Sequence, residues 1–228
     1  MKTIAIDITH YERMSGYGVV TRNIVKGLLQ ADPDNFYVLI SHTHQNVENL
    51  KEFKNRKFVN TNENFTLYKF FTLPKYLKKH NVEVFLSLDQ TLPFKKVCKY
   101  LIVEHDIVYQ RMGKRNLLKN FFMNKHIRRL TFLYYFLDFE KLWLKKADTI
   151  ITPSQFTKEE LIQYYHIRPE KINVVYRGMD YTFYSNKQYK KKNQILFPFP
   201  SLHSDFAFKL ANELLEKRII ESIVMTKP

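Results

Sequence analysis

The residues best suited to proton transfer are His105 and Asp106, which stand side by side. They follow a short apolar run, residues 100–103, that we expect to form a buried strand. An imidazole beside a carboxylate at the end of a strand can accept or donate a proton near neutral pH. A buried, hydrogen-bonded histidine with no chemical role is the competing interpretation, and the sequence leaves both open.

Asp89 and Gln90 form a second candidate site, in a polar loop after an expected strand at residues 82–87. Carboxylate and amide groups in such a place can hydrogen-bond the hydroxyl groups of a sugar. Aspartate is also common in turns, and Pro93 fixes the backbone nearby. Ordinary turn chemistry is therefore the alternative.

A third candidate is a glycine-containing loop, residues 15–18, just before an expected helix. Gly16 and Gly18 would let the backbone approach a ligand closely, and the N-terminus of a helix favours an anion. The third glycine of a dinucleotide-binding fingerprint is missing, because Thr21 stands there. A tight loop without a ligand is the alternative to a phosphate-binding loop.

Short apolar runs alternate along the chain with segments of helical periodicity. The expected strands are residues 3–7, 36–40, 82–87, 100–103, 148–152 and 172–176. The expected helices end before residue 32, span 73–79, lie within 114–146 and begin after Ser154, a candidate N-cap. This alternation predicts an α/β fold with a doubly wound parallel sheet. Ligands bind at the carboxyl ends of the strands in such sheets, so the loops with Gly18, Gln90 and His105 should meet along one edge.

A polar, charged stretch, residues 181–193, predicts a linker between two domains. Residues 1–180 would form the first domain. Residues 194–228 would supply two strands, 195–197 and 222–225, and a helix, 206–217, between them. One such βαβ unit cannot close a hydrophobic core. We therefore expect residues 194–228 to be the start of an incomplete second domain.

The composition excludes several classes of protein. The 228 residues are 45% hydrophobic, which permits a sizeable core and argues against disorder. The single cysteine, Cys98, excludes a disulfide framework and a cysteine-only metal cluster, and agrees with a reducing cytosol. No signal-peptide pattern opens the chain, and no apolar run approaches the ~20 residues of a membrane span. We expect a cytoplasmic protein that is soluble or peripheral to a membrane.

A net charge of +15 suggests an anionic partner, although scattered lysines on solvated faces would explain it equally well. One hypothesis is a nucleic-acid-binding module built on a basic, aromatic-rich segment. Its residues would be Arg111, Lys114, Arg115, Lys119, Phe121, Phe122, Lys125, Arg128, Arg129 and Phe132. No nucleic-acid-binding motif accompanies them, and aromatic residues at helical spacing more often belong to a core. Nucleic acid is therefore not the favoured partner.

The order of several motifs resembles the family 4 glycosyltransferases. These motifs are the Gly-x-Gly loop, the Asp-Gln-x-Leu-Pro loop, the His-Asp strand end, and the segment from Ala147 to Asp180 with its Ser-x-Phe-Thr-Lys and Pro-Glu-Lys-Ile runs. The resemblance covers residues 1–183. It implies a GT-B fold, in which two Rossmann-like domains face each other and the N-terminal one binds mainly the acceptor.

The resemblance also implies a role for each candidate residue. Gly16 and Gly18 would face the donor diphosphate, His105 and Asp106 would stand near the transferred sugar, and Asp89 and Gln90 would line the cleft. Ser154 and Thr157 would form a structural turn, and Gly178 would act as a hinge after Arg177, which replaces the family's asparagine. The family lysine that holds the diphosphate would correspond to Ser204.

The resemblance implies a retaining enzyme that uses a nucleotide sugar, a glycan or lipid-linked acceptor, and neither a metal ion nor another cofactor. The paired glutamates of the donor site would lie beyond Pro228, so a truncated chain that needs a second chain for its donor domain is one hypothesis. A non-catalytic remnant is the other. Under the first, the basic segment would lie against an anionic membrane on its cytoplasmic face.

Overall fold

The computed structural model describes residues 1–107, 138–178, 194–197, 216 and 222–225. The chain divides into two compact units, Met1–Arg177 and Gly178–Pro228. The strands of the first unit are β1 (Thr3–Asp7), β2 (Phe36–Ser41), β3 (Arg56–Asn60), β4 (Val84–Ser87), β5 (Lys99–Val103), β6 (Thr149–Thr152) and β7 (Ile172–Val174). Its helical elements are α1 (Gly16–Ala31), η1 (Glu48–Leu50), α2 (Phe65–Leu67), η2 (Tyr68–Thr72), α3 (Leu73–Lys79), α6 (Phe139–Lys146), α7 (Gln155–Tyr165) and η3 (Pro169–Lys171).

The first unit contains one seven-stranded sheet in the order β3-β2-β1-β4-β5-β6-β7. Every neighbouring pair in this sheet is parallel. From β1 the sheet is extended on one side by β2 and β3, and from β4 it is extended on the other side by β5, β6 and β7. The strand order therefore reverses between β1 and β4. The α/β fold with a doubly wound, Rossmann-like parallel sheet is therefore confirmed, and its ligand crevice is expected beside β1 and β4.

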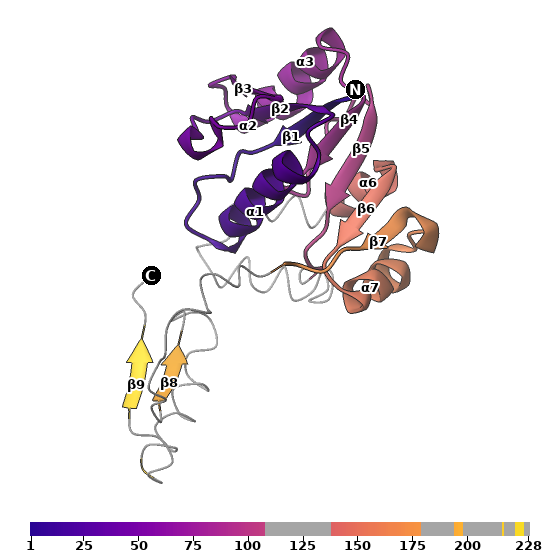
Figure 1. Cartoon of the computed structure of the whole chain (residues 1–228). Coiled ribbons are helices and arrows are strands. Elements are labelled where there is room, and N and C mark those ends of the chain that lie inside the picture. The colour runs from indigo at the N-terminus through magenta and orange to yellow at the C-terminus, as the bar shows by residue number, and fades with distance from the viewer. Residues whose placement is uncertain (108–137, 179–193, 198–215, 217–221, 226–228) are drawn as a thin grey trace. The chain divides into compact units, whose positions relative to one another are not determined.

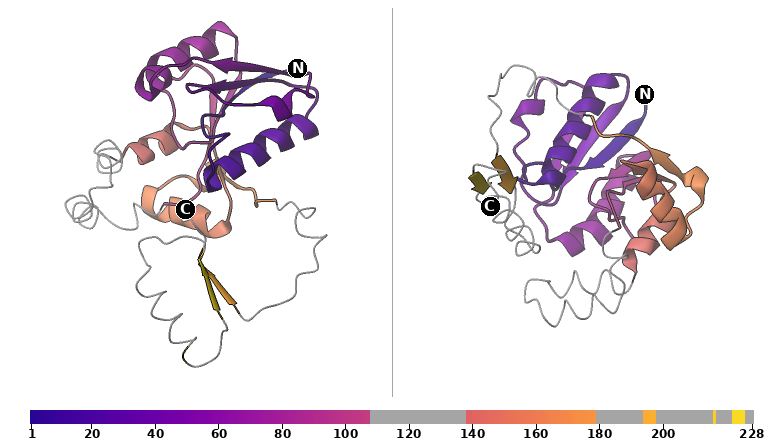
Figure 2. Two further views of the ribbon diagram at one scale, coloured as in Figure 1. Left: turned by 90° about the vertical axis from the view of Figure 1, so that its left-hand side faces the viewer. Right: turned by 90° about the horizontal axis from the view of Figure 1, so that it is seen from below.

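Side chains of each strand alternate between two hydrophobic clusters, one on each face of the sheet. Ala5 and Phe85 belong to the first cluster, which includes Trp143 of α6 and Leu161 of α7. Neighbouring strand residues such as Ile6 and Leu86 belong to the second cluster, with Val25 and Leu29 of α1. Helices thus cover both faces, and Figures 1 and 2 show α1 on one side of the sheet.

β3 was not predicted from the sequence. This strand lies at the edge of the sheet and carries polar residues, Arg56, Lys57 and Asn60, so it lacks an apolar run. Only Phe58 and Val59 contribute to the core, one on each face. An edge strand pairs with only one neighbouring strand, so fewer of its side chains need to be apolar.

The predicted helix at 73–79 is α3, but it is the last part of a longer helical stretch that begins at Phe65. Its middle section, η2, is a π-helix over Tyr68–Thr72. Such wider turns are rare and occur mostly as single-turn bulges, frequently at functional sites. Of the helix expected within 114–146, only α6 falls among the described residues.

The second unit contains two parallel strands, β8 (Gln194–Phe197) and β9 (Ser222–Met225). They correspond to the two strands predicted for residues 194–228. The predicted linker lies outside the described residues, and of the helix expected at 206–217 only Glu216 is described, in helical conformation. Among the described residues, no helix is both long and apolar enough to cross a bilayer.

Candidate functional site

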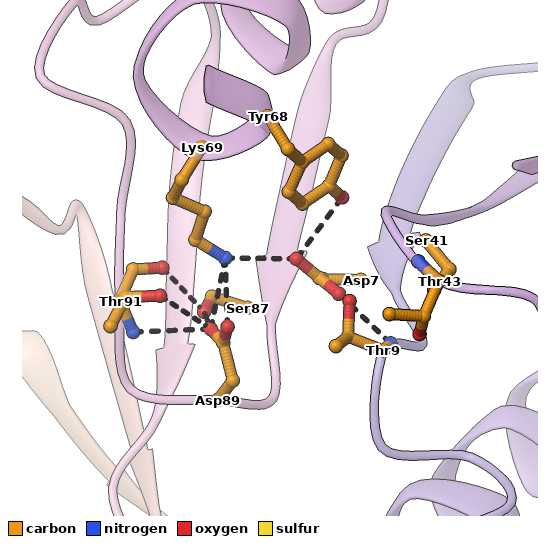
Figure 3. A network of polar contacts seen from close by, with 9 residues as sticks. All are labelled: Asp7, Thr9, Ser41, Thr43, Tyr68, Lys69, Ser87, Asp89 and Thr91. Atoms are coloured by element: carbon orange, nitrogen blue, oxygen red, sulfur yellow. Dashed lines mark hydrogen bonds and ion pairs between the residues drawn. The ribbon is translucent and has the colours of Figure 1, made fainter. Parts of the chain in front are cut away.

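The carboxyl ends of β1 and β4, where the strand order reverses, are joined by a buried lysine. Nζ of Lys69 lies 2.8 Å from Oδ2 of Asp7 and 3.0 Å from both carboxylate oxygens of Asp89. Tyr68 donates its hydroxyl proton to the same oxygen of Asp7 at 3.1 Å. Figure 3 shows Lys69 between the two carboxylates.

Charge pairing dominates this network. Both side chains of the Lys69–Asp7 pair are at most 1% exposed, and burial by itself would lower the pKa of the ammonium group. The two carboxylates outweigh burial, so the pKa of Lys69 lies above its ordinary value. At Asp89 burial raises the pKa, but Lys69 and the hydrogen bonds from Ser87 and Thr91 together outweigh burial and lower the pKa of that carboxyl. Lys69 and Asp89 are therefore both charged near neutral pH.

The contacts of Asp89 argue against the sugar-binding role predicted for it. Its carboxylate accepts hydrogen bonds from Lys69, from the Ser87 hydroxyl at 2.8 Å, and from the backbone and hydroxyl of Thr91 at 3.2 and 2.8 Å. The side chain is only 6% exposed. Asp89 therefore holds its own loop in place, because protein donors already occupy both of its oxygens.

Lys69 and Asp7 were not among the predicted site residues. A lysine inside the run Tyr68–Phe71 gives no sign of burial, since lysine is almost always exposed. One signal was available in the sequence. Asp7 ends one expected apolar strand and Asp89 follows another, and two carboxylates buried at the same edge of a sheet require a nearby cation.

Gln90 connects this network with the loop after β5. Its backbone has a φ of 62°, which is uncommon for a residue other than glycine. Its side-chain oxygen accepts a hydrogen bond from the Tyr17 hydroxyl at 3.1 Å, and its Nε2 donates to Glu104. The Tyr17 ring also contacts the His105 ring edge-on, with centroids 5.0 Å apart. The loops with residues 16–18, Gln90 and His105 therefore meet at one edge of the sheet, as predicted.

His105 is paired with Arg177. A guanidinium nitrogen of Arg177 lies 2.7 Å from Nδ1 of the half-buried imidazole. Burial and the positive charge of Arg177 lower the pKa of His105 to about 4, against the opposing charge of Asp106. The imidazole is neutral at physiological pH in this arrangement. The catalytic role expected for His105 and Asp106 stays a prediction.

Two buried glutamates lie behind this edge. Glu104 is fully buried, and burial together with Glu140 and Asp106 raises the pKa of its carboxyl well above the ordinary value. Burial likewise raises the pKa of Glu140 to about 7 despite a hydrogen bond with Tyr165. Gln90 thus donates to a carboxyl group whose pKa is raised by burial and by neighbouring carboxyls.

Gly16 and Gly18 form the first turn of α1 rather than a loop before it. A Cβ atom on Gly18 would lie 1.8 Å from the carbonyl oxygen of Arg13, so only glycine lets the preceding loop pack against the helix. A Cβ atom on Gly16 would meet nothing within 4 Å. The need for glycine at position 18 is therefore explained by packing.

Ser154 caps α7 as predicted. Its hydroxyl accepts a hydrogen bond from the backbone N–H of Thr157 at 3.0 Å, and the two hydroxyls lie 2.9 Å apart. The first backbone N–H groups of a helix have no partner within the helix, and the Ser154 hydroxyl supplies one for the N–H of Thr157. Gly178 is the first residue of the second unit, and its role as a hinge stays a prediction.

The chemistry open to these residues is hydrogen bonding and charge stabilisation at the carboxyl edge of the sheet. Among the described residues, no three His, Cys, Asp or Glu side chains gather as a metal site. Tyr17 and Arg177 contact the neutral His105, and Gln90 hydrogen-bonds Tyr17. Such groups suit the binding of hydroxyl groups and of an anion.

Comparison with solved structures shows a fold shared with glycosyltransferases. A glycosyltransferase from Rickettsia africae has a TM-score of 0.54 and 14% identity over 99% of this chain and 68% of its own. HepE of Anabaena, solved with UDP, has a TM-score of 0.54 and 12% identity over 99% of this chain and 70% of its own. The wall teichoic acid polymerase TagF has a TM-score of 0.54 and 13% identity over 99% of this chain and 56% of its own.

At these identities the structures show the fold alone, and it is the GT-B type that the sequence motifs implied. No curated protein is similar enough to this chain to count as a match. A family profile described as Glycosyltransferase Family 4 matches residues 14–183. Since this match covers most of the chain, the chain belongs to glycosyltransferase family 4.

Proposed function

We propose that this chain supplies the acceptor-side domain of an enzyme that transfers a sugar from a nucleotide sugar, with retention of configuration, to a glycan or lipid-linked acceptor. The observation that carries the proposal is the meeting of Tyr17, Gln90 and His105 at the carboxyl edge, next to the reversal of strand order. Ligands bind at this place in doubly wound sheets. HepE, which shares the fold, binds UDP.

The acceptor has a candidate site within the same unit. An open hollow of about 300 Å³ lies beside the loop after β1. It is lined by Tyr11, Glu12, Arg22, Asn46, Glu48 and Asn49. Carboxylate, amide and guanidinium groups together can donate and accept the hydrogen bonds of several sugar hydroxyls.

A membrane is a candidate surface for a lipid-linked acceptor. Most of the basic segment, with the residues named for nucleic-acid binding, lies outside the described residues. The described part of this segment is α6, where Leu142 is 45% exposed beside the exposed Lys145. Phe94, which is half exposed, packs against Trp143 of the same helix. Exposed apolar side chains with lysines suit an anionic lipid surface. Co-sedimentation with liposomes should succeed with anionic lipid and fail with zwitterionic lipid alone.

The enzymatic proposal is tested by assaying transfer and hydrolysis with a panel of sugar nucleotides. The chain is assayed alone and with the product of the adjacent gene that could supply the rest of a donor domain. Gln90→Ala should lower the rate by about tenfold or more, since it removes the link between Tyr17 and Glu104. The exposed Arg168, paired with Glu170 at the surface, provides the control variant Arg168→Met.

Activity in either assay that falls in Gln90→Ala and persists in Arg168→Met supports the proposal. Absence of both turnover and nucleoside diphosphate binding, in every combination, would favour the non-catalytic remnant. Binding of short RNA or DNA with a steep salt dependence, and without nucleotide-sugar binding, would favour the nucleic-acid module instead.

A further inference from the structure

Arg177 makes a contact that its position in the sequence does not suggest. It follows β7, at the end of the first unit, and its side chain reaches the loop after β5. There one guanidinium nitrogen lies 2.7 Å from Nδ1 of His105. Among the described residues, Nδ1 of His105 is the hydrogen-bond partner of the Arg177 guanidinium. Arg177 is itself exposed.

The contact fixes the state of the imidazole. A guanidinium group is always protonated and only donates, so Nδ1 of His105 accepts the hydrogen bond. The proton of the neutral ring is then on Nε2, and the ring also hydrogen-bonds the backbone of Leu88. With Nδ1 engaged by Arg177, His105 is suited to orient the guanidinium group.

An oriented, exposed guanidinium has further N–H groups for a ligand. It offers five N–H donors in a rigid plane, and the bond to Nδ1 engages one of them. The remaining donors match two oxygens of a phosphate group, a geometry that arginine recognises better than lysine does. The nearby Tyr17 ring packs against His105 and limits the positions open to the imidazole.

We infer that Arg177 binds the diphosphate of the donor at this edge of the sheet, and that His105 is the positioning residue that holds its guanidinium. The inference rests on the proposed function, because it assigns the ligand of the same edge. It gives position 177 a binding role in this chain.

Anion binding and the protonation of His105 are then linked. The groups that face the imidazole are Arg177 from the end of β7, Asp106 on its own loop, Tyr17 from α1 and the backbone of Leu88. A bound diphosphate cancels part of the positive charge of Arg177, so it must raise the pKa of His105 from its value of about 4. By the same linkage, the anion binds more tightly as the pH falls toward that pKa.

The test is a titration of the His105 ring resonances by NMR in the full 228-residue chain, with and without inorganic pyrophosphate. Calorimetry under the same conditions measures the affinity for pyrophosphate and for a panel of nucleoside diphosphates. Arg177→Met should weaken pyrophosphate binding by about tenfold or more, and Arg177→Lys by less. Arg168→Met, at an exposed arginine that pairs with Glu170, is the matched control and should bind normally.

Two variants separate positioning from simple structural support. His105→Gln keeps an oxygen that can accept from Arg177, whereas His105→Phe keeps the ring but offers no acceptor. We expect the glutamine variant to retain most of the affinity for pyrophosphate and the phenylalanine variant to lose it. Equal affinities of these two variants would remove the positioning role of His105 and overturn that part of the inference.

The outcomes also separate this inference from the proposed function. If nucleoside diphosphates bind as well to Arg177→Met as to the unmodified chain, Arg177 is not their ligand and the inference is wrong while the function stands. If pyrophosphate binds, raises the pKa of His105 and depends on Arg177, but no sugar nucleotide is turned over, the inference stands and the function fails. Absence of any pyrophosphate binding overturns the inference.

Discussion

Replacing Lys69 by methionine should be among the most destabilising single changes in the first unit. Methionine keeps an unbranched apolar stem but removes the ammonium group that contacts Asp7 and Asp89 at 2.8 to 3.0 Å. Both carboxylates would then be buried without their cation. Breaking a buried ion pair by removing one partner costs about 3–5 kcal/mol. That is a large share of the roughly 5–15 kcal/mol that stabilises a typical domain.

The assay is urea denaturation of the full chain followed by circular dichroism, with Lys51→Met as the matched control. Lys51 makes an ion pair with Glu48 in which both side chains are 67% exposed. Exposed pairs contribute little, so this control should change the free energy of unfolding by less than about 1 kcal/mol. A loss in Lys69→Met as small as that of the control would refute the claim that Lys69 holds the ends of β1 and β4 together.

The pH dependence of this loss gives a second check. In the unmodified chain Lys69 lowers the pKa of Asp89, so stability from this group is present above the ordinary pKa of the carboxyl and is lost as the pH falls. In Lys69→Met the carboxyls gain protons more readily and the buried charge disappears. The difference between the two chains should therefore shrink from about pH 7 toward about pH 4. A difference that stays constant over this range would mean that lost packing, and not charge, causes the effect.

Three further predictions follow from single side chains. Gly18→Ala should destabilise the chain by about 1–3 kcal/mol, because its Cβ would overlap the Arg13 carbonyl. Gly16→Ala should be neutral or stabilising by at most about 1 kcal/mol, and thermal unfolding compares the two variants directly. Burial raises the pKa of Glu140 from 4.5 to about 7, so the stability linked to its protonation is complete below pH 4.5 and is lost as the pH rises to about 7. Unfolding free energies at about pH 5 and about pH 8 should differ by roughly 3 kcal/mol on this account, and Glu140→Gln should abolish that part of the difference. Ser154→Ala should cost about 1 kcal/mol in urea denaturation, since it removes the acceptor for the Thr157 backbone N–H, and an unchanged midpoint would deny the cap any role.

The main elements of the sheet could be predicted because their interior positions are apolar. β1 and α3 have the predicted bounds, and the succession of strands and helices allowed a parallel sheet to be inferred before any pairing was known. β3 could not be predicted, since an edge strand with Arg56 and Lys57 resembles a loop in its composition. β7 ends at Val174, before the predicted end at residue 176, although the backbone N–H of Val175 still bonds the carbonyl oxygen of Thr152 in β6.

The edge that joins Gln90 and His105 could be predicted from topology, since the carboxyl ends of neighbouring parallel strands lie side by side. The individual contacts could not. The bond between Arg177 and His105 joins residues from different loops, and no periodicity connects them. The π-helix that contains Lys69 also breaks the spacing from which buried helical positions are recognised.

The charge states on the two sides of Gln90 show why residue type alone is insufficient. Asp89 and Glu104 are both buried carboxyls near the ends of neighbouring strands, yet burial has opposite outcomes for them. Lys69 helps to lower the pKa of Asp89 against the effect of burial, whereas burial and the neighbouring carboxyls of Glu140 and Asp106 raise the pKa of Glu104. A raised pKa at Glu104 disfavours negative charge at the edge where a donor diphosphate is proposed to bind, and the exposed guanidinium of Arg177 adds a positive charge there. The sign of the potential at this edge is therefore set by which carboxyl has a cation beside it, a relation that exists only in the folded chain.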